Sequence, residues 1–282
     1  MIERLAIVGI GLLGGSVAKA ARASGLAREI VGIGRVRARL EPAVRDGALD
    51  RATTDLREGL AGADFVVLAA PVLTNEALLA RVWPLAESVA IVTDVGSTKA
   101  ALVRAAQRLG GTRPLAFIGS HPMAGSEQSG YAVARADLFR GATVIVTPTD
   151  ASEPRALKTV TAFWEAVGAR VAPLDPEAHD RVVAAISHLP HLVADALVDA
   201  VLAFEPNALS FAARGFKDST RIAASDPAMW QEIFVGNRDA LLASLAAFRR
   251  VLDDLEALVR SGDAAALEAA LARIKRARES VG

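Results

Sequence analysis

The chain has 282 residues, of which 52% are hydrophobic, and its 32 basic residues balance its 32 acidic residues. It contains no cysteine, which excludes disulfides and thiolate chemistry, and the neutral charge balance argues against a nucleic acid or a membrane surface as a partner. The first apolar run is interrupted at Gly9, too early for a signal peptide or a membrane span. We therefore expect a cytoplasmic protein.

Short apolar runs alternate with helical patterns through the first half of the chain. The runs are RLAIVGI (4–10), EIVGIG (29–34), ADFVVLAAP (63–71), VAIVTDVG (89–96), PLAFIG (114–119) and ATVIVTP (142–148). Helical patterns cover Leu12–Ser24 and Lys99–Leu109, and a further helix and strand are expected between Pro154 and Pro173. Such alternation is typical of a parallel sheet with helices on both faces. The sequence therefore predicts an α/β fold with a Rossmann-type, doubly wound parallel sheet.

The pattern changes after this sheet, where long alanine- and leucine-rich segments replace the strand-like runs. These helical segments cover 177–204, 227–261 and 263–277, and Asp226 followed by Pro227 fits a helix N-cap and first turn. We therefore predict two domains, an α/β domain over residues 1–174 and an all-helical domain over residues 175–282.

A glycine-rich loop, VGIGLLGGS, follows the first predicted strand and opens a helix. Its three glycines have the G-x-G-x-x-G spacing. In this motif the first glycine makes a tight turn, the second admits a pyrophosphate, and the third lets the helix pack closely on the strand. A packing turn without a ligand is the alternative. We interpret the loop as a dinucleotide site lined by Gly9, Gly11, Leu12, Leu13 and Gly14.

The end of the second strand indicates which dinucleotide binds. An NAD site has an acid there for the ribose hydroxyls, whereas this strand ends in Gly34 and Arg35. A small residue followed by arginine leaves room for a 2′-phosphate and offers it donors. Arginine outnumbers lysine 27 to 5 in this chain, so a solvated arginine is the alternative. We predict NADP as the favoured cofactor, with NAD also usable.

The segment GSHPMAGSEQSG (119–130) places His121 directly after a predicted strand, at the sheet edge where ligands bind. An imidazole titrates near neutrality and suits a proton acceptor. Ser97, in TDVGSTK, follows the neighbouring strand and is placed to orient the ring. A lone loop histidine is more often structural, but two polar strand ends on one edge favour a catalytic role.

Five motifs together resemble one family: GIGLLGGS, DVGSTK, GSHPMAGSEQSG, SHLPH and GFKDSTRIAASDPAMW. In this order they resemble the prephenate/arogenate dehydrogenases of tyrosine biosynthesis, from Gly9 to at least Trp230. The resemblance implies a Rossmann domain followed by a helical dimerisation domain, hence a homodimer. It also implies NAD(P)-dependent oxidative decarboxylation of prephenate to 4-hydroxyphenylpyruvate and CO2. Arogenate, with an amino group in place of the keto group, is the alternative substrate.

The same resemblance implies roles for three residues near the reacting carbon. The histidine matching His121 accepts a hydrogen bond from the ring C4 hydroxyl as hydride leaves C4. The serine matching Ser97 helps to position this group, and the glutamate matching Glu127 lies at the mouth of the site.

Further residues implied by the resemblance bind the substrate. Arg221 binds a substrate carboxylate, His188 faces the substrate, and Trp230 lies near the active site of its own or the partner subunit. Lys217 stands where the family often has arginine, and a lysine ammonium cannot form the bidentate pair that a guanidinium forms. Arg214, Lys217 and Arg221 follow the i, i+3, i+7 spacing of one helix face, with a solvated basic face as the alternative.

Other interpretations of the same residues are open. His179, His188 and His191 suggest a metal site, but Pro190 interrupts the helix and strict zinc spacing is lacking, so we expect no metal. A β-hydroxyacid dehydrogenase would want a lysine-centred helix near residues 170–185, which this sequence lacks. A non-catalytic dinucleotide sensor would have no use for His121, Ser97 and Arg221 together.

Overall fold

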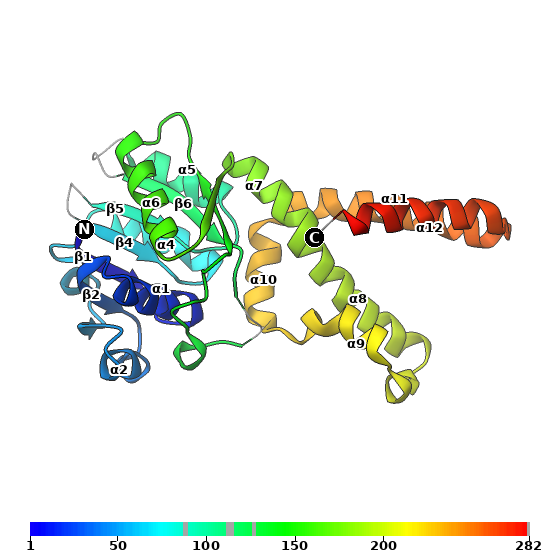
Figure 1. The fold of residues 1–282 in the computed structure, drawn as a ribbon, viewed down its shortest axis with the longest axis horizontal. Helices are drawn as coiled ribbons and strands as arrows, with labels where there is room; N and C mark the ends of the chain where they lie inside the picture. The colour runs from blue at the N-terminus through cyan, green and yellow to red at the C-terminus, as the bar shows by residue number, and fades with distance from the viewer. Residues whose placement is uncertain (87–89, 111–115, 126–127, 281–282) are drawn as a thin grey trace.

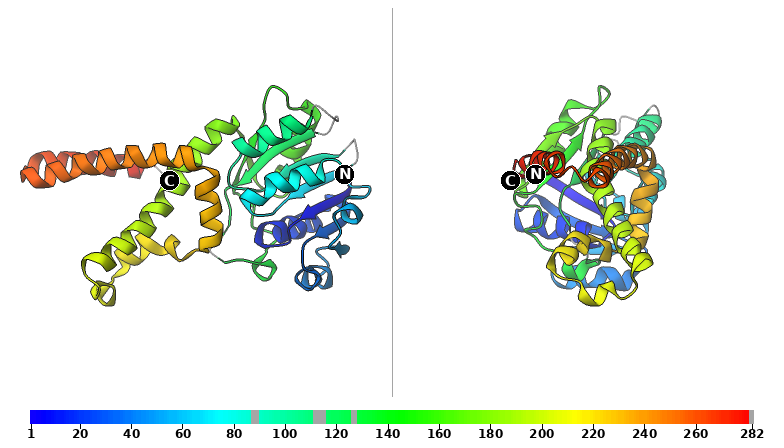
Figure 2. Two further views of the ribbon diagram at one scale, coloured as in Figure 1. Left: turned by 180° about the vertical axis from the view of Figure 1, so that it is seen from behind. Right: turned by 90° about the vertical axis from the view of Figure 1, so that its right-hand side faces the viewer.

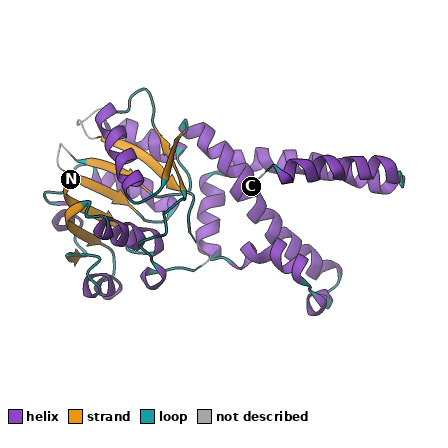
Figure 3. Cartoon of the chain, in the orientation of Figure 1, coloured by secondary structure: helices purple, strands orange, loops and turns teal. Residues whose placement is uncertain are grey.

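The structure, a computed structural model, describes residues 1–86, 90–110, 116–125 and 128–280. Within these residues eight strands form a single sheet in the order β3-β2-β1-β4-β5-β6-β7-β8, and a helical domain follows it (Figures 1 and 3). The strands are β1 (Ile2–Val8), β2 (Ala27–Ile33), β3 (Arg51–Thr53), β4 (Phe65–Leu68), β5 (Ile91–Asp94), β6 (Ala116–Pro122), β7 (Thr143–Thr147) and β8 (Arg170–Pro173). The helices of this domain are α1 (Leu12–Ala23), α2 (Arg37–Arg45), α3 (Leu56–Leu60), α4 (Val72–Val82), α5 (Ala100–Gly110) and α6 (Pro154–Ala166).

The predicted Rossmann-type sheet is confirmed, with one difference at its far edge. The six neighbouring strands β3-β2-β1-β4-β5-β6 are parallel and follow the doubly wound order. In contrast, β7 pairs antiparallel with β6, and β8 is parallel to β7. In the described part of the connection from β6 to β7, the short 3-10 helix Tyr131–Val133 is the only helix, and antiparallel neighbours need no helical crossover. The sequence also did not indicate β3, because three residues are too few to show a strand pattern.

Two apolar clusters form the core, one on each face of the sheet. Leu5 and Ile7 of β1 belong to the cluster covered by α1, α2 and α6, whereas Ala6 and Val8 belong to the cluster covered by α3, α4 and α5. Alternate residues of a strand point to opposite faces, so a strand covered on both faces must be apolar throughout. This explains why the buried part of β1, Leu5 to Val8, is a continuous apolar run, whereas Glu3 and Arg4 stand at the more exposed start of the strand.

The helical domain begins with a long rod that leaves the sheet near β8. The rod consists of α7 (Pro176–Val183), a π-helical segment (Ala184–His188) and α8 (Leu189–Phe204). Pro190 has no N–H to donate to the carbonyl four residues before it, and the widened π turn lies directly ahead of this position. The remaining elements are a 3-10 helix (Ala208–Phe211), α9 (Arg214–Thr220), a second 3-10 helix (Arg221–Ala224), α10 (Pro227–Gly236), α11 (Arg238–Ser261) and α12 (Ala264–Glu279).

The helix predicted over 227–261 is wrong as a single element, because the structure breaks it at Asn237. The backbone of Asn237 leaves the helical region at φ −121° and ψ 32°. Its side-chain amide donates to the Asp180 carbonyl at 2.7 Å and lies 3.1 Å from His188 Nδ1. Side-chain hydrogen bonds to a distant helix therefore stabilise the break, which local helix propensity does not indicate.

Two arms extend from the junction with the sheet domain, one made of α8 and α9 and the other of α11 and α12 (Figures 1 and 2). Both arms carry exposed apolar side chains, among them Leu202, Phe204, Leu242 and Val259. The rod Pro176–Phe204 is long and apolar enough to cross a membrane by length and composition alone, and 28% of its apolar window is buried. One such helix is weak evidence for a span, and the apolar surface equally suits a protein partner.

Candidate active site

The glycine loop has the geometry that a bound dinucleotide needs. Gly9 has φ +101°, and a Cβ there would lie 2.4 Å from the Ala69 carbonyl oxygen. A Cβ at Gly14 would lie 1.9 Å from the Gly9 carbonyl oxygen. At Gly11, the N-cap of α1, a Cβ would meet no atom of the described chain within 4 Å. Two glycines therefore serve close packing, and the third leaves the helix N-terminus open to an anion.

The second strand ends where the sequence predicts. β2 ends at Ile33, so Gly34 and the exposed Arg35 follow at its carboxyl end. A Cβ at Gly34 would lie 2.8 Å from the tip of the Leu40 side chain on α2. Close packing against Leu40 is therefore one physical reason for a glycine at position 34.

His121 lies near the end of β6 and is 8% exposed. Its Nδ1 is 2.9 Å from Nε2 of His179, and Nδ1 of His179 is 2.8 Å from Oδ1 of Asp180. Burial, followed by the nearby His179, Lys99 and His188, holds the pKa of His121 well below its usual value. The ring is therefore neutral at physiological pH and keeps one nitrogen lone pair.

Asp180 joins the helical domain to the start of α5. Its Oδ1 accepts from the Lys99 N–H at 2.8 Å and its Oδ2 accepts from the Ala100 N–H at 3.0 Å. Burial alone would raise the pKa of Asp180, but the hydrogen bonds from His179 and from these two backbone N–H groups lower it below its ordinary value. Asp180 is thus an ionised carboxylate in a buried position.

A buried ion pair supports the strand ends beneath His121. The Lys99 ammonium and the Asp94 carboxylate are both fully buried and hydrogen-bonded to each other. Asp94 Oδ1 also accepts from the Ser120 N–H at 3.1 Å, next to His121 in the chain. Breaking such a pair leaves an uncompensated charge in the interior, so Asp94 and Lys99 hold β5, β6 and α5 in register.

The other two residues expected around the reacting carbon are Ser97 and Glu127. Ser97 is half-buried in the loop between β5 and α5. Glu127 lies outside the described residues. The hydrogen-bond partner of His121 Nδ1 is His179 and not Ser97, a contact that the sequence did not indicate. The dipeptide of His179 and Asp180 on α7 was the available signal, but nothing local in it points to His121.

His188 and Trp230 meet at the junction of the two domains. His188 is 1% exposed, and burial lowers its pKa to about 4. The Trp230 ring lies edge-on to His188 at 6.2 Å and stacks on His191 at 3.5 Å between ring centroids. Trp230 is therefore packed against two histidines of its own chain.

Lys217 and Arg221 lie on the arm formed with α8. Lys217 is in α9, and Arg221 begins the 3-10 helix that follows it. Both segments pack against α8, and both residues are exposed. Arg214, on the same segment, pairs with Asp218 at 3.3 Å on the surface, which agrees with a solvated role for that arginine.

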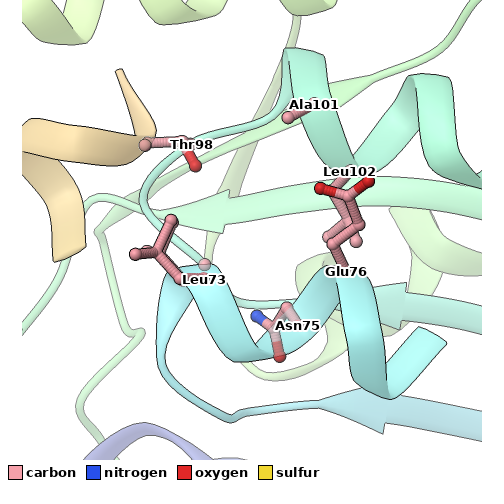
Figure 4. Close-up of a pocket in the computed structure, with 9 residues that line it drawn as sticks. Leu73, Asn75, Glu76, Thr98, Ala101 and Leu102 are labelled. Carbon is pink, nitrogen blue, oxygen red and sulfur yellow. The ribbon is translucent and has the colours of Figure 1, made fainter. Parts of the chain in front are cut away.

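A cavity of about 50 Å³ lies between α4, the loop 96–98, α5 and the end of α10 (Figure 4). Ligand pockets are usually about 300–1,000 Å³, so this cavity is water-sized and does not hold a substrate. The Asn75 side chain is 1% exposed, and neither its amide nitrogen nor its oxygen has a partner within the described ranges. The site is polar and large enough for ordered water.

The doubly wound sheet, the open glycine loop and a neutral buried histidine at the same sheet edge define a dinucleotide-dependent dehydrogenase. The nucleotide-binding domain of prephenate dehydrogenase matches residues 17–173, and the dimerization domain of prephenate dehydrogenase matches residues 175–273. The chain therefore belongs to the prephenate dehydrogenase family.

Individual relatives agree with this family. A prephenate dehydrogenase of Bacillus subtilis is 35% identical, over 94% of this chain and 72% of its own. The prephenate dehydrogenase of Aquifex aeolicus, crystallised with hydroxyphenyl propionate and NAD+, has a TM-score of 0.94 at 36% identity and covers 100% of this chain and 99% of its own. Synechocystis arogenate dehydrogenase has a TM-score of 0.86 at 31% identity, over 99% of this chain and 100% of its own.

The two glycines of the loop should respond differently to alanine. Gly11→Ala should fold normally and raise the dinucleotide Kd about tenfold or more, because its methyl group occupies the space that a pyrophosphate needs. Gly14→Ala should instead lower the free energy of unfolding by about 1–3 kcal/mol, because its Cβ overlaps the Gly9 carbonyl. Fluorescence titration and chemical unfolding measure the two effects. Unchanged dinucleotide affinity in Gly11→Ala would contradict this assignment.

Acid should destabilise the protein through its buried histidines. The pKa of His188 is about 4 in the folded chain against an ordinary 6.5, so the unfolded chain takes up the proton first as the pH falls. Stability is complete above about pH 6.5 and decreases toward pH 4, by about 2 kcal/mol for this residue between pH 7.5 and pH 5. Urea unfolding at both pH values should give a smaller pH dependence for His188→Gln than for wild type.

Proposed function

We propose that this protein catalyses the NAD(P)-dependent oxidative decarboxylation of prephenate to 4-hydroxyphenylpyruvate and CO2. The observation that carries the proposal is the neutral, buried His121 at the carboxyl edge of a dinucleotide-binding sheet, in a chain of the prephenate dehydrogenase family. A bound nicotinamide supplies the acceptor for the hydride. The chain's own residues position the substrate and stabilise the charge that develops on it.

His121 acts at the substrate hydroxyl. It accepts a hydrogen bond from the C4 hydroxyl while hydride leaves C4, which stabilises the positive charge that forms at that carbon. The carboxylate at C1 leaves as CO2, and the electrons of the broken bond complete the aromatic ring. The product keeps the C4 oxygen as a phenol. Ser97 helps to position this hydroxyl.

Four residues of the helical domain bind the rest of the substrate. Arg221 pairs with a substrate carboxylate, and Lys217 adds positive charge on the same arm. His188 faces the substrate and Trp230 packs beside it, as their mutual contact supports. The dinucleotide is held by Gly9, Gly11, Leu12, Leu13 and Gly14, with Gly34 and Arg35 at the adenosine ribose.

The preferred dinucleotide and the alternative substrate are each supported by one observation. Gly34 and Arg35 favour NADP, while the Aquifex aeolicus relative carries NAD+, so NAD is the second cofactor. The similarity to Synechocystis arogenate dehydrogenase makes arogenate the second substrate. Initial rates with both substrates and both dinucleotides, followed by absorbance of the reduced nicotinamide, test the whole proposal. Absence of dinucleotide reduction with either substrate would refute it.

The assembly that we propose is a cytoplasmic homodimer formed by the helical domains. The exposed apolar side chains of α8 and α11 support this, because they lie on two arms that a second copy would cover. The match to a dimerization domain supports the same arrangement.

Replacing His121 should affect the chemical step and not cofactor binding. His121→Asn should lower kcat by about 10²–10⁴-fold, the usual contribution of a positioned general base, with an unchanged Kd for the dinucleotide. Steady-state kinetics and a binding titration on the same preparation provide both numbers. A kcat within a few-fold of wild type would remove His121 from the mechanism.

Replacing Arg221 should affect substrate binding. A carboxylate away from the reacting carbon is bound equally in ground and transition states, so Arg221→Ala should raise the KM for prephenate more than tenfold and leave the KM for the dinucleotide unchanged. Arg221→Lys should recover only part of the loss, since an ammonium cannot form the bidentate pair. If the bound carboxylate is the one lost as CO2, kcat will fall as well. Wild-type kinetics in the alanine variant would contradict the assignment.

A further inference from the structure

Three groups form a continuous hydrogen-bonded series behind His121. His121 Nδ1 contacts His179 Nε2 at 2.9 Å, and His179 Nδ1 contacts Asp180 Oδ1 at 2.8 Å. The His121 and His179 rings meet edge-on, with centroids 5.1 Å apart and planes at 64°. All three groups are buried, so water does not compete for these contacts.

The direction of each hydrogen bond follows from Asp180. This carboxylate accepts the N–H groups of Lys99 and Ala100 as well as the contact from His179. An ionised carboxylate can only accept, so His179 carries its proton on Nδ1. Because His179 is neutral, its Nε2 has a lone pair and must accept from His121. His121 therefore carries its proton on Nδ1, and its Nε2 is left as an acceptor.

We propose that His179 and Asp180 are positioning residues that fix the tautomer of His121, so that its Nε2 lone pair faces the substrate hydroxyl. This proposal rests on the proposed function, because it gives His121 its acceptor role. The opposite tautomer would place a donor at Nε2, which cannot accept a hydrogen bond from the hydroxyl. In a neutral histidine, the hydrogen bond made by one ring nitrogen determines which nitrogen carries the proton. The tautomer of His121 is therefore determined by the partner of its Nδ1.

The same series also balances charge during the reaction. When His121 Nε2 takes up positive character from the hydroxyl proton, its Nδ1–H bond to His179 strengthens. The negative charge of Asp180 lies one ring further away and stabilises the change. The arrangement has the logic of a buried carboxylate that orients a catalytic imidazole, extended by one histidine.

The surrounding charges determine the pH range in which the series works. Lys99, Asp94 and Asp180 face His179, and His188 and Lys99 face His121. Burial is the main cause that lowers the pKa of His179, with Lys99 acting in the same direction and Asp180 opposing it. Protonation of His179 in acid would turn its Nε2 into a donor to His121 Nδ1. The proton of His121 would then lie on Nε2. Activity should therefore fall in acid without loss of dinucleotide binding.

The tautomer can be measured directly, because the chain has only four histidines. Two-bond ¹H–¹⁵N correlation spectra of the intact protein labelled with ¹⁵N-histidine distinguish Nδ1–H from Nε2–H rings. Single His→Gln variants assign the four rings. We expect wild-type His121 to carry its proton on Nδ1. A wild-type His121 protonated on Nε2 overturns the proposal, whatever the kinetics show.

Two variants of His179 separate the positioning role from simple packing. His179→Leu fills much of the same space but offers no acceptor, and should lower kcat about 10²-fold while the dinucleotide Kd stays unchanged. His179→Gln can place an amide oxygen near the former Nε2 and should recover at least tenfold of that loss, with the His121 proton kept on Nδ1. Equal kcat in the two variants, or a leucine variant within threefold of wild type, overturns the proposal.

Glu177→Gln is the matched control. Glu177 lies on α7 two residues before His179 and pairs with Arg104 of α5 at 2.8 Å, on the exposed side of the same helix contact. It should leave kcat and the His121 spectrum unchanged. Asp180 is unsuitable as the main test because it also holds the start of α5. Absence of dinucleotide reduction with either substrate would refute the proposed function, whereas an Nε2–H ring in an active wild-type enzyme refutes this inference alone.

Discussion

The carboxylate of Asp180 accepts three N–H groups, two from the start of α5 and one from His179, and the organisation of the site depends on these contacts. A buried carboxylate is costly unless it is fully hydrogen-bonded, and here the sheet domain supplies two of its donors. The position of α7 is thereby tied to the carboxyl edge of the sheet. His179, one residue away on the same helix, is brought to His121.

A buried ion pair also supports the carboxyl edge of the sheet. Lys99 and Asp94 are fully buried, and Asp94 also accepts the N–H of Ser120, which precedes His121 in β6. Movement of α5 would disturb both this pair and the contacts of Asp180, because Lys99 participates in each through different atoms. The backbone near His121 is thus supported by two sets of interactions that share one residue. The role that we propose for His121 requires such rigidity, because a positioned group acts only in the correct orientation.

The helical domain makes buried polar contacts at the junction and leaves apolar surface at its arms. Asn237 interrupts the helix between α10 and α11, and its side chain contacts both Asp180 and His188. These contacts fix the position at which α11 begins. Farther out, side chains such as Phe204 and Val259 remain exposed. The described contacts of His121 and His179 come from one chain, whereas the surface of its arms suits the homodimer that we propose.

Local sequence patterns determined the class of fold and the position of the glycine loop. Apolar runs of a few residues, helical periodicity and the spacing of Gly9, Gly11 and Gly14 all act over short stretches of chain, so they can be read without the structure. The end of β2 and the placement of His121 at the end of β6 follow from the same patterns. The reversal of β7 and the break at Asn237 do not, since each depends on partners that lie elsewhere in the fold.

The partners of His121 were decided by the tertiary structure alone. His121 and His179 are 58 residues apart, and Asp180 is 81 residues from Lys99. No local pattern distinguishes His179 from the other histidines of the rod, and at sequence level all three could equally suggest a metal site. Only the packing of α7 on the sheet edge brings His179 and Asp180 to His121. A histidine in a sequence shows what chemistry is available, but its tautomer depends on the groups that folding places beside it.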